Sequence, residues 1–259
     1  MAIATLTTDW SRHDFYVAAL KGEILKRNPA AAIIDVSHQI PAFQLQGAAY
    51  VMRSAFHHFP EKSVHVIGVD SEPTPKKPVV AVSYQGHFFV AVDNGVMGLI
   101  CDSQPDAVVT VDYEDQGNGF SALVPFAKAA AALTLGEPIE SIGTPKPSVN
   151  HMPMLLPVLD ASFIIGNVIY IDTFGNIITN ITCQEFDRVA KGRRYEILIQ
   201  SNRYKVKAIS STYNAVEDGE FVALFNSAGH LEVAQNKGRI ASILNLDMGS
   251  SVRINFFNQ

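Results

Sequence analysis

The fold is decided by residues 31–70, AAIIDVSHQIPAFQLQGAAYVMRSAFHHFPEKSVHVIGVD. The two ends of this stretch, 31–37 and 63–70, are short apolar runs that predict buried strands. Between them apolar residues recur at helical spacing until Pro60. Because a strand over 2–8 and another helical pattern come first, the order is strand, helix, strand, helix, strand. This order predicts a three-layer α/β domain with a mostly parallel sheet.

Working outward, residues 78–84 and 87–92 predict a hairpin, and residues 107–113 a further strand. Residues 126–136, FAKAAAALTLG, predict a helix that ends at a glycine C-cap.

The chain changes character after a proline-rich stretch, residues 137–160, which has no periodicity and marks a domain boundary. Short apolar strands separated by turns follow it, and no helical pattern of similar strength is found. The sequence therefore predicts an α/β domain over 1–150, a linker over 151–162 and an all-β, barrel-like domain over 163–259.

Composition excludes several classes of protein. The net charge is -5 and no basic patch stands out, so nucleic-acid binding has little support. No run approaches the roughly 20 apolar residues that span a bilayer. The charged residues Asp9 and Arg12 lie where a signal peptide would need an apolar run. We therefore expect a soluble cytoplasmic protein. The two cysteines and scattered histidines have no metal-ligand spacing, so no metal site is expected.

Acidic residues lie at or near the ends of three predicted strands: Asp9, Asp35 and Asp70. Ligands bind beyond the carboxyl ends of strands in open α/β sheets, although an Asp there can also simply cap a helix. A second candidate is residues 172–176, Asp-Thr-Phe-Gly-Asn, between two apolar runs. This pentapeptide fits either a binding loop or an ordinary turn, because Gly and Asn both tolerate turn conformations.

Motifs for dinucleotide, P-loop, zinc-protease and nucleophile-elbow chemistry are missing from the sequence. Six segments in matching order do resemble one family, the S-adenosyl-L-methionine hydroxide adenosyltransferases, which are relatives of the fluorinase and chlorinase halogenases. The segments are TLTTDWSRHDFYVAALKGEI, IIDVSHQIPAF, HVIGVD, FVAVDNGVM, YIDTFGNIITNI and FNSAGHLEVAQNKGRIASIL. Together they run from about residue 5 to residue 255.

The resemblance implies an α/β domain joined to a β-barrel, assembled as a homotrimer whose adenosyl substrate lies between subunits. It implies that Asp9 accepts hydrogen bonds from both ribose hydroxyls, for which two carboxylate oxygens are suited. It places Asp14 and Asp172 near the ammonium group of the methionine moiety. It also implies that Phe43 and Phe174 form apolar walls around the sugar and adenine.

Three further assignments come from the resemblance alone. Asn176 would bind the adenine edge, because an amide can both donate and accept. Ser227 and Glu232 would hold the amino-acid moiety and adenine. For every residue in this set, a capped turn or a packed core is the alternative interpretation.

The catalytic set departs from the family pattern. The family activates water with Asp, Arg and His, and Asp70 matches the Asp. The loop that carries the Arg is replaced by SEPTPKKP, with Lys76 or Lys77 as the nearest cation, and Ser121 stands at the His position. The halogenases carry Tyr at the position of Asp70. Because a carboxylate there would repel a halide ion, Asp70 favours water as the nucleophile.

Three hypotheses follow. The first is a hydrolase that converts S-adenosyl-L-methionine and water to adenosine and L-methionine, without a cofactor, using Asp70, Lys76 and Ser121. The second is an adenosyl-ligand binding protein that has lost catalysis. The third is a structural or oligomeric protein whose motifs serve only as turns and core.

Overall fold

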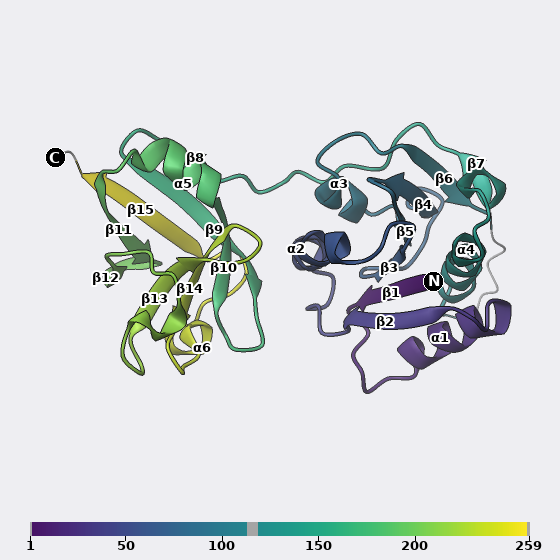
Figure 1. The fold of residues 1–259 in the computed structure, drawn as a ribbon, viewed down its shortest axis with the longest axis horizontal. Helices are drawn as coiled ribbons and strands as arrows, with labels where there is room; N and C mark the ends of the chain where they lie inside the picture. The colour runs from purple at the N-terminus through teal and green to yellow at the C-terminus, as the bar shows by residue number, and fades with distance from the viewer. Residues whose placement is uncertain (1, 113–118, 258–259) are drawn as a thin grey trace. The chain divides into compact units, whose positions relative to one another are not determined.

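The computed structural model describes residues 2–112 and 119–257. It divides into two compact units, Met1–Pro153 and Met154–Gln259, which are called the N-terminal and C-terminal domains below (Figure 1). Residues 151–157, within the segment expected as a linker, have no regular secondary structure.

The N-terminal domain contains a seven-stranded sheet in the order β2-β1-β3-β5-β4-β6-β7. Pairs β2–β1, β1–β3 and β3–β5 are parallel, whereas the pairs that join β5, β4, β6 and β7 are antiparallel, so the sheet is mixed. The elements are β1 (Ile3–Thr8), α1 (Tyr16–Arg27), β2 (Ala32–Ser37), α2 (Leu45–Ala55), η1 (Phe56–His58), β3 (Val64–Gly68), β4 (Val79–Tyr84), β5 (His87–Val92), α3 (Val96–Ile100), β6 (Ala107–Val111), α4 (Leu123–Leu135), η2 (Ile139–Ser141) and β7 (Gly143–Pro145).

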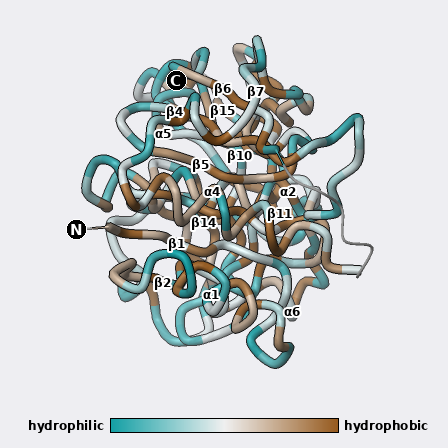
Figure 2. Tube along the Cα trace, turned by 90° about the vertical axis from the view of Figure 1, so that its right-hand side faces the viewer, coloured by the Kyte–Doolittle hydropathy of each residue, from teal (hydrophilic) through white to brown (hydrophobic). Residues whose placement is uncertain are grey.

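Helices cover both faces of this sheet. Val66 and Val90 pack with residues of α1 and α4 in one buried cluster, and Ile67 and Phe89 pack with residues of α2 and α3 in another. Successive strand residues point to opposite faces, which is why neighbours in sequence enter different clusters. Figure 2 shows the apolar character of β5, one of these central strands. Strands buried on both faces give the continuous apolar runs seen in the sequence.

The C-terminal domain is a nearly closed, barrel-like antiparallel sheet in the order β12-β11-β15-β9-β10-β14-β13, with β8 paired to β9. An isolated parallel bridge joins Ile209, in the segment that follows β12, to Ala223 in β13, at the other end of that order. The elements are β8 (Val158–Leu159), β9 (Phe163–Ile171), β10 (Ile177–Thr182), α5 (Cys183–Ala190), β11 (Arg194–Ile199), β12 (Ser201–Val206), η3 (Tyr213–Ala215), β13 (Phe221–Phe225), β14 (His230–Gln235), α6 (Ile240–Leu244) and β15 (Ser251–Phe257).

The barrel-like sheet expected for this domain is present, but the domain is not purely β, because two short helices, α5 and α6, interrupt its strands. The eight-residue α5 is too short for a clear periodic pattern. Its start is nevertheless encoded, since Thr182 and Glu185 form a capping box. In the N-terminal domain the helix ending at Gly136 is confirmed, with that residue at φ 87°. The strand expected over 107–113 ends at Val111, and Tyr113 lies outside the described residues.

Candidate functional site

Three segments of the N-terminal domain converge on the carboxylate of Asp9, just beyond the end of β1. The Asp9 amide donates to the Gly68 carbonyl at 3.2 Å, which joins it to the end of β3. Its Oδ2 accepts hydrogen bonds from the backbone N–H of Phe43 at 3.0 Å and of Asp70 at 3.3 Å. Because β1, β2 and β3 are parallel, their carboxyl ends share one edge of the sheet. Asp9, Phe43 and Asp70 therefore meet at this edge, where ligands of α/β sheets bind.

Both residues that donate to Asp9 have left-handed backbones, with φ 63° at Phe43 and φ 46° at Asp70. Such conformations cost an L-residue on the order of 1–3 kcal/mol and occur preferentially at functional sites. The Phe43 side chain is 73% exposed, so burial of its ring does not explain the conformation. An exposed aromatic ring at this edge of the sheet is suited to stacking on a ligand.

Trp10, the residue after Asp9, contacts two loops at this edge of the sheet. Its ring lies so close to Gly68 that a Cβ at that position would overlap it, and its Nε1 donates to Ser71 Oγ at 3.2 Å. It also packs edge-on against Phe120, with ring centroids 5.0 Å apart. The loop after β3 and the turn before α4 are thus attached to the same indole.

The residues predicted to help Asp70 make contacts that the sequence did not indicate. Ser121 Oγ donates to Glu72 Oε1 at 3.2 Å, and Glu72 was not singled out from the sequence. Lys76 is exposed, and its backbone carbonyl accepts from Asn150 Nδ2 at 3.3 Å. Asp14 lies in an exposed turn before α1. Within residues 2–112 and 119–257, no hydrogen bond or ion pair joins Lys76 or Asp14 to Asp9 or Asp70.

A chain of polar groups, with buried Thr8 and His38 at one end and exposed Asp35 at the other, connects the end of β2 to the end of β1. His38 Nδ1 lies 2.9 Å from Thr8 Oγ1, and its Nε2 lies 3.1 Å from Asp35 Oδ1. Lys21 Nζ pairs with Asp35 Oδ2 at 2.8 Å. Burial tends to raise the pKa of Asp35, but hydrogen bonds from Lys21 and His38 outweigh it, so the pKa is lowered. Asp35 therefore supports the loop that carries Phe43 rather than capping a helix.

In the C-terminal domain, the pentapeptide 172–176 is a tight loop organised by its own aspartate. Asp172 Oδ1 accepts from the amides of Phe174 at 2.9 Å and Asn176 at 2.8 Å, and Oδ2 accepts from Asn176 Nδ2 at 3.0 Å. Gly175 has φ 80°, which explains the glycine at that position. The Phe174 ring is left 71% exposed at the tip.

Arg239 and the start of α6 hold this loop from behind. Arg239 Nη1 donates to the Thr173 carbonyl at 2.9 Å, and the Ala241 amide donates to the Gly175 carbonyl at 3.0 Å. A Cβ at Gly175 would come within 3.0 Å of Arg239 Cβ. Sequence reasoning missed Arg239, although it lies inside the last of the six matching segments.

Glu232 lies on β14, which pairs with β10, and its register partner Ile178 is two residues beyond Asn176. Glu232 is 4% exposed, and its carboxylate accepts from Tyr213 Oη at 2.6 Å and from Asn226 Nδ2 at 3.3 Å. Ser227 is exposed on the turn between β13 and β14. Glu232 is thus fixed by side chains that the sequence alone did not connect to it.

Family models match both domains. The SAM hydroxide adenosyltransferase N-terminal domain matches residues 4–143, and the C-terminal domain of the same family matches residues 166–253. The chain belongs to the SAM hydroxide adenosyltransferase family. The resemblance seen in the six segments is thereby confirmed.

Full-length relatives of this family member carry a functional name. This chain is 29% identical to the (R)-S-adenosyl-L-methionine hydrolase of Methanocaldococcus jannaschii, over an alignment that covers 97% of this chain and 95% of the relative. It is 30% identical to the hydrolase of the same name from Thermus thermophilus, covering 95% and 97%. A crystal structure of an uncharacterized conserved protein from Thermotoga maritima matches with TM-score 0.85 and 28% identity, covering 98% and 99%.

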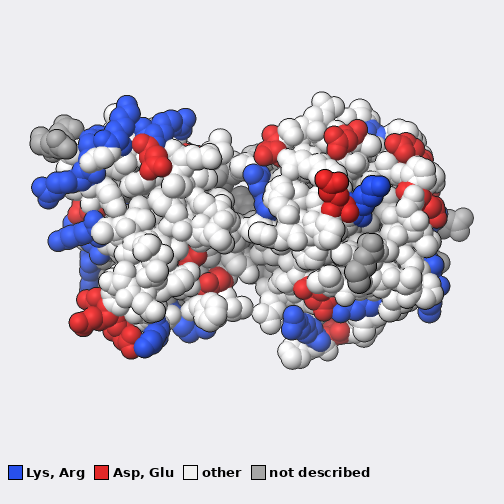
Figure 3. All heavy atoms as spheres, in the orientation of Figure 1, with Lys and Arg blue, Asp and Glu red and all other residues white. Residues whose placement is uncertain are grey.

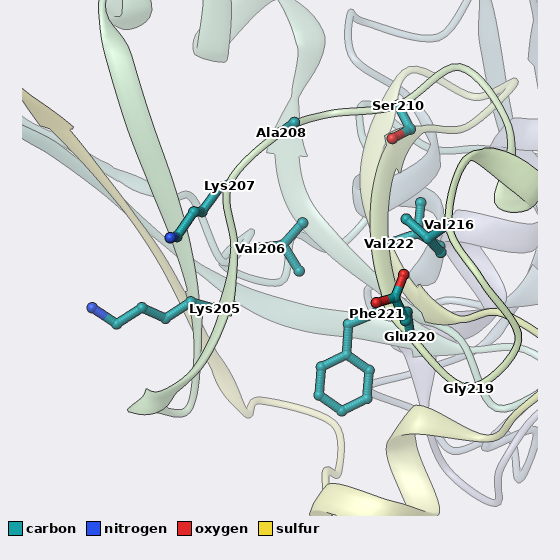
Figure 4. A pocket seen from close by; sticks show the side chains of 10 residues that line it. All are labelled: Lys205, Val206, Lys207, Ala208, Ser210, Val216, Gly219, Glu220, Phe221 and Val222. Atoms are coloured by element: carbon teal, nitrogen blue, oxygen red, sulfur yellow. The ribbon is translucent and has the colours of Figure 1, made fainter.

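A groove of about 430 Å³ in this family member lies elsewhere, beside β12 and β13 (Figure 4). Its lining includes Lys205, Lys207, Glu220 and Phe221, and none of the residues predicted for the site. The groove is therefore not part of the candidate adenosyl site.

Lys and Arg side chains gather over α5, β11 and β12 (Figure 3).

In the described residues, no group of three or more His, Cys, Asp or Glu side chains is arranged to hold a metal ion. Nor does any helix within residues 2–112 and 119–257 have the length and apolar character needed to cross a membrane.

Proposed function

We propose that this protein hydrolyses S-adenosyl-L-methionine by attack of water at C5′, giving adenosine and L-methionine. The observation that carries the proposal is the convergence of Asp9, Phe43 and Asp70 at the carboxyl edge of the sheet, in a chain whose two domains both match this family. Relatives at 29–30% identity over nearly the full length are named hydrolases, which favours turnover over the binding-only hypothesis.

The reaction needs no redox partner. Water oxygen forms a bond to C5′ while the C5′–S bond breaks, and the bonding electron pair stays on sulfur as the thioether of methionine. One proton leaves the water and ends in solvent, and Asp70 is the group that accepts it first. Since the sulfonium is already a good leaving group, no cofactor is needed and the chain supplies orientation and a base.

Binding is divided between the domains. In the N-terminal domain, Oδ1 of Asp9 accepts from the ribose diol, because Oδ2 already has two backbone donors. Phe43 gives an apolar surface to the sugar, and Asp14 attracts the methionine ammonium group. Lys76 and the Ser121–Glu72 pair stand in the places of the family Arg and His, and they polarise the water rather than deprotonate it.

In the C-terminal domain, Phe174 stacks on adenine and Asn176 recognises its edge. Asp172 attracts the ammonium group and also holds the loop, because a carboxylate has more lone pairs than its three loop hydrogen bonds use. Glu232 and Ser227 complete the contacts to adenine and the amino-acid moiety.

The test uses each sulfur epimer of S-adenosyl-L-methionine separately, because the relatives' name specifies the (R) form. Purified protein is incubated with either epimer in ¹⁸O-labelled water, with and without EDTA, and adenosine is followed by chromatography and mass spectrometry. We expect adenosine from the (R) epimer, labelled at its 5′-oxygen and unaffected by EDTA. Adenosine release no faster than in buffer, or release without label, would refute the proposal.

Phe174→Ala is expected to weaken binding of the adenosyl substrate by about 5- to 150-fold, because stacking of a base on an aromatic ring contributes about 1–3 kcal/mol. The loss should appear in Kd or KM, while the melting temperature stays within about 1 °C because the ring is exposed. Phe257→Ala, at another exposed phenylalanine on β15, is the matched control. Equal affinities for both variants would remove Phe174 from the site.

A homotrimer with sites between subunits is part of the proposal. The exposed rings of Phe43 and Phe174, one in each domain, are consistent with walls that a second subunit completes. Light scattering should give about three times the chain mass of 28.2 kDa. A monomer that turns over substrate would exclude intersubunit sites. The cytoplasmic location expected from the sequence stays a prediction.

A further inference from the structure

The peptide groups around Asp70 are held from two sides, and one of the two holding residues has no role in the proposal above. On one side, Asp9 Oδ2 accepts from the Asp70 amide at 3.3 Å. On the other, Asn94 Nδ2 donates to the carbonyl oxygens of Val69 and Asp70, both at 2.9 Å. The left-handed backbone of Asp70 is therefore fixed by side chains from two different segments.

Asn94 is itself held firmly at the turn between β5 and α3. Its Oδ1 accepts from the backbone N–H of Val96 at 3.1 Å, and its backbone N–H donates to the Val92 carbonyl at 2.8 Å. The residue before it, Asp93, has a fully buried carboxylate paired with Lys146. These contacts restrict the motion of the Asn94 side chain, and so also the motion of the peptide groups that it binds.

Only an amide fits these contacts. Asn94 uses both Nδ2 hydrogens and Oδ1 at once, whereas Asp would have no donor and Ser would have one. Loss of the amide would leave the Val69 and Asp70 carbonyls without this partner and release the backbone that aims the Asp70 carboxylate.

We propose that Asn94 is a positioning residue that holds the strained backbone of Asp70 and thereby aims its carboxylate. The inference rests on the proposed function, since it gives Asp70 the base role. Asn94 acts through Asp70 and does not contact the substrate. Its removal therefore lowers kcat and leaves KM nearly unchanged.

The test is a double-mutant cycle of Asn94→Ala and Asp70→Asn. In the wild-type background, Asn94→Ala should lower kcat by about 10- to 100-fold, because small displacements of a catalytic group have effects of this size. In the Asp70→Asn background, it should change the residual rate less than 2-fold. An equal fold-loss in both backgrounds would overturn the inference, as would a loss confined to KM. Asn94→Ser, which keeps one donor, should fall between wild type and Ala.

Asn28→Ala is the matched control. Asn28 is 3% exposed and its amide donates to Thr134 Oγ1 at 3.0 Å, but it caps the end of α1 just before β2 begins, at the other edge of the sheet. This variant should lower the melting temperature without changing kcat. If it lowers kcat as much as Asn94→Ala does, general destabilisation explains both.

Amide hydrogen exchange gives a readout that does not depend on turnover. Asn94→Ala should speed exchange at the Asp70 amide at least 10-fold, whereas Asn28→Ala should leave it unchanged. If the wild-type protein releases no adenosine, the proposed function fails while this measurement still tests the clamp. Unchanged exchange at Asp70 in Asn94→Ala would show that Asn94 does not hold this backbone.

Discussion

Replacing Asp70 with Asn is expected to lower adenosine formation by about 10²- to 10⁴-fold, the usual contribution of a general base. The change removes the charge and keeps the shape of the side chain. Asn also tolerates the left-handed backbone found here, at φ 46°, better than Ala does. The fold and the affinity for substrate should therefore be preserved.

The measurement is single-turnover adenosine release together with calorimetric binding of the substrate. Asp106→Asn serves as the control, because Asp106 is an exposed carboxylate elsewhere in the N-terminal domain. An Asp70→Asn variant with wild-type turnover would leave Glu72, through Ser121, as the remaining carboxylate candidate. Loss of binding together with turnover would instead assign Asp70 to substrate recognition.

Acidification from pH 7 to pH 4 is expected to reduce the stability of the N-terminal domain through a buried histidine pair. His65 is fully buried, with Nδ1 2.8 Å from Thr5 Oγ1 and Nε2 3.1 Å from His87 Nδ1. Burial, helped by the neighbouring His87, lowers the pKa of His65 to about 3. The pKa of His87 is also lowered, mainly by burial and then by His57.

The sign follows from which state takes up the proton. Below about pH 6.5 the unfolded chain protonates this histidine, whereas the folded chain excludes the proton until about pH 3. Stability is therefore complete above pH 6.5 and is lost as the pH falls toward 3. Between pH 7 and pH 4, His65 alone accounts for a loss of about 3 kcal/mol in the free energy of unfolding.

Urea unfolding at several pH values would measure this loss. The chain has one tryptophan, Trp10, so its fluorescence reports on the N-terminal domain. His65→Gln can keep hydrogen bonds to Thr5 and His87 but cannot titrate, so its stability should fall less steeply with acid than that of wild type. His58→Gln, at an exposed histidine, should follow wild type. Parallel curves for wild type and His65→Gln would contradict the prediction.

The elements that could be predicted from sequence are those whose signal is local. The parallel half of the sheet follows from apolar runs that alternate with helical patterns, and the end of α4 follows from Gly136. The capping box of α5 is equally local, but it begins a helix too short for periodicity to show. The antiparallel pairing of β4, β6 and β7 depends on tertiary packing, which no window of residues contains.

Asp9 and Asp70 could be named as candidates from the sequence because each follows a predicted strand, and Phe174 because it lies in the pentapeptide 172–176; their roles stay predictions. The sequence did not indicate three residues whose partners lie far away along the chain. Glu72 pairs with Ser121, Asn94 with the Asp70 carbonyl, and Arg239 with the Thr173 carbonyl. A turn motif such as Asp-Asn-Gly shows that a chain reverses. It does not show which distant peptide its amide will bind.

The left-handed backbones of Phe43 and Asp70 have a consequence for directed evolution. Glycine at either position would relieve the unfavourable φ angle, so a screen that rewards heat resistance alone should enrich such replacements. Each one removes a side chain from the edge where Asp9 gathers them. Selection for thermal tolerance and selection for turnover would then pull these two codons in opposite directions.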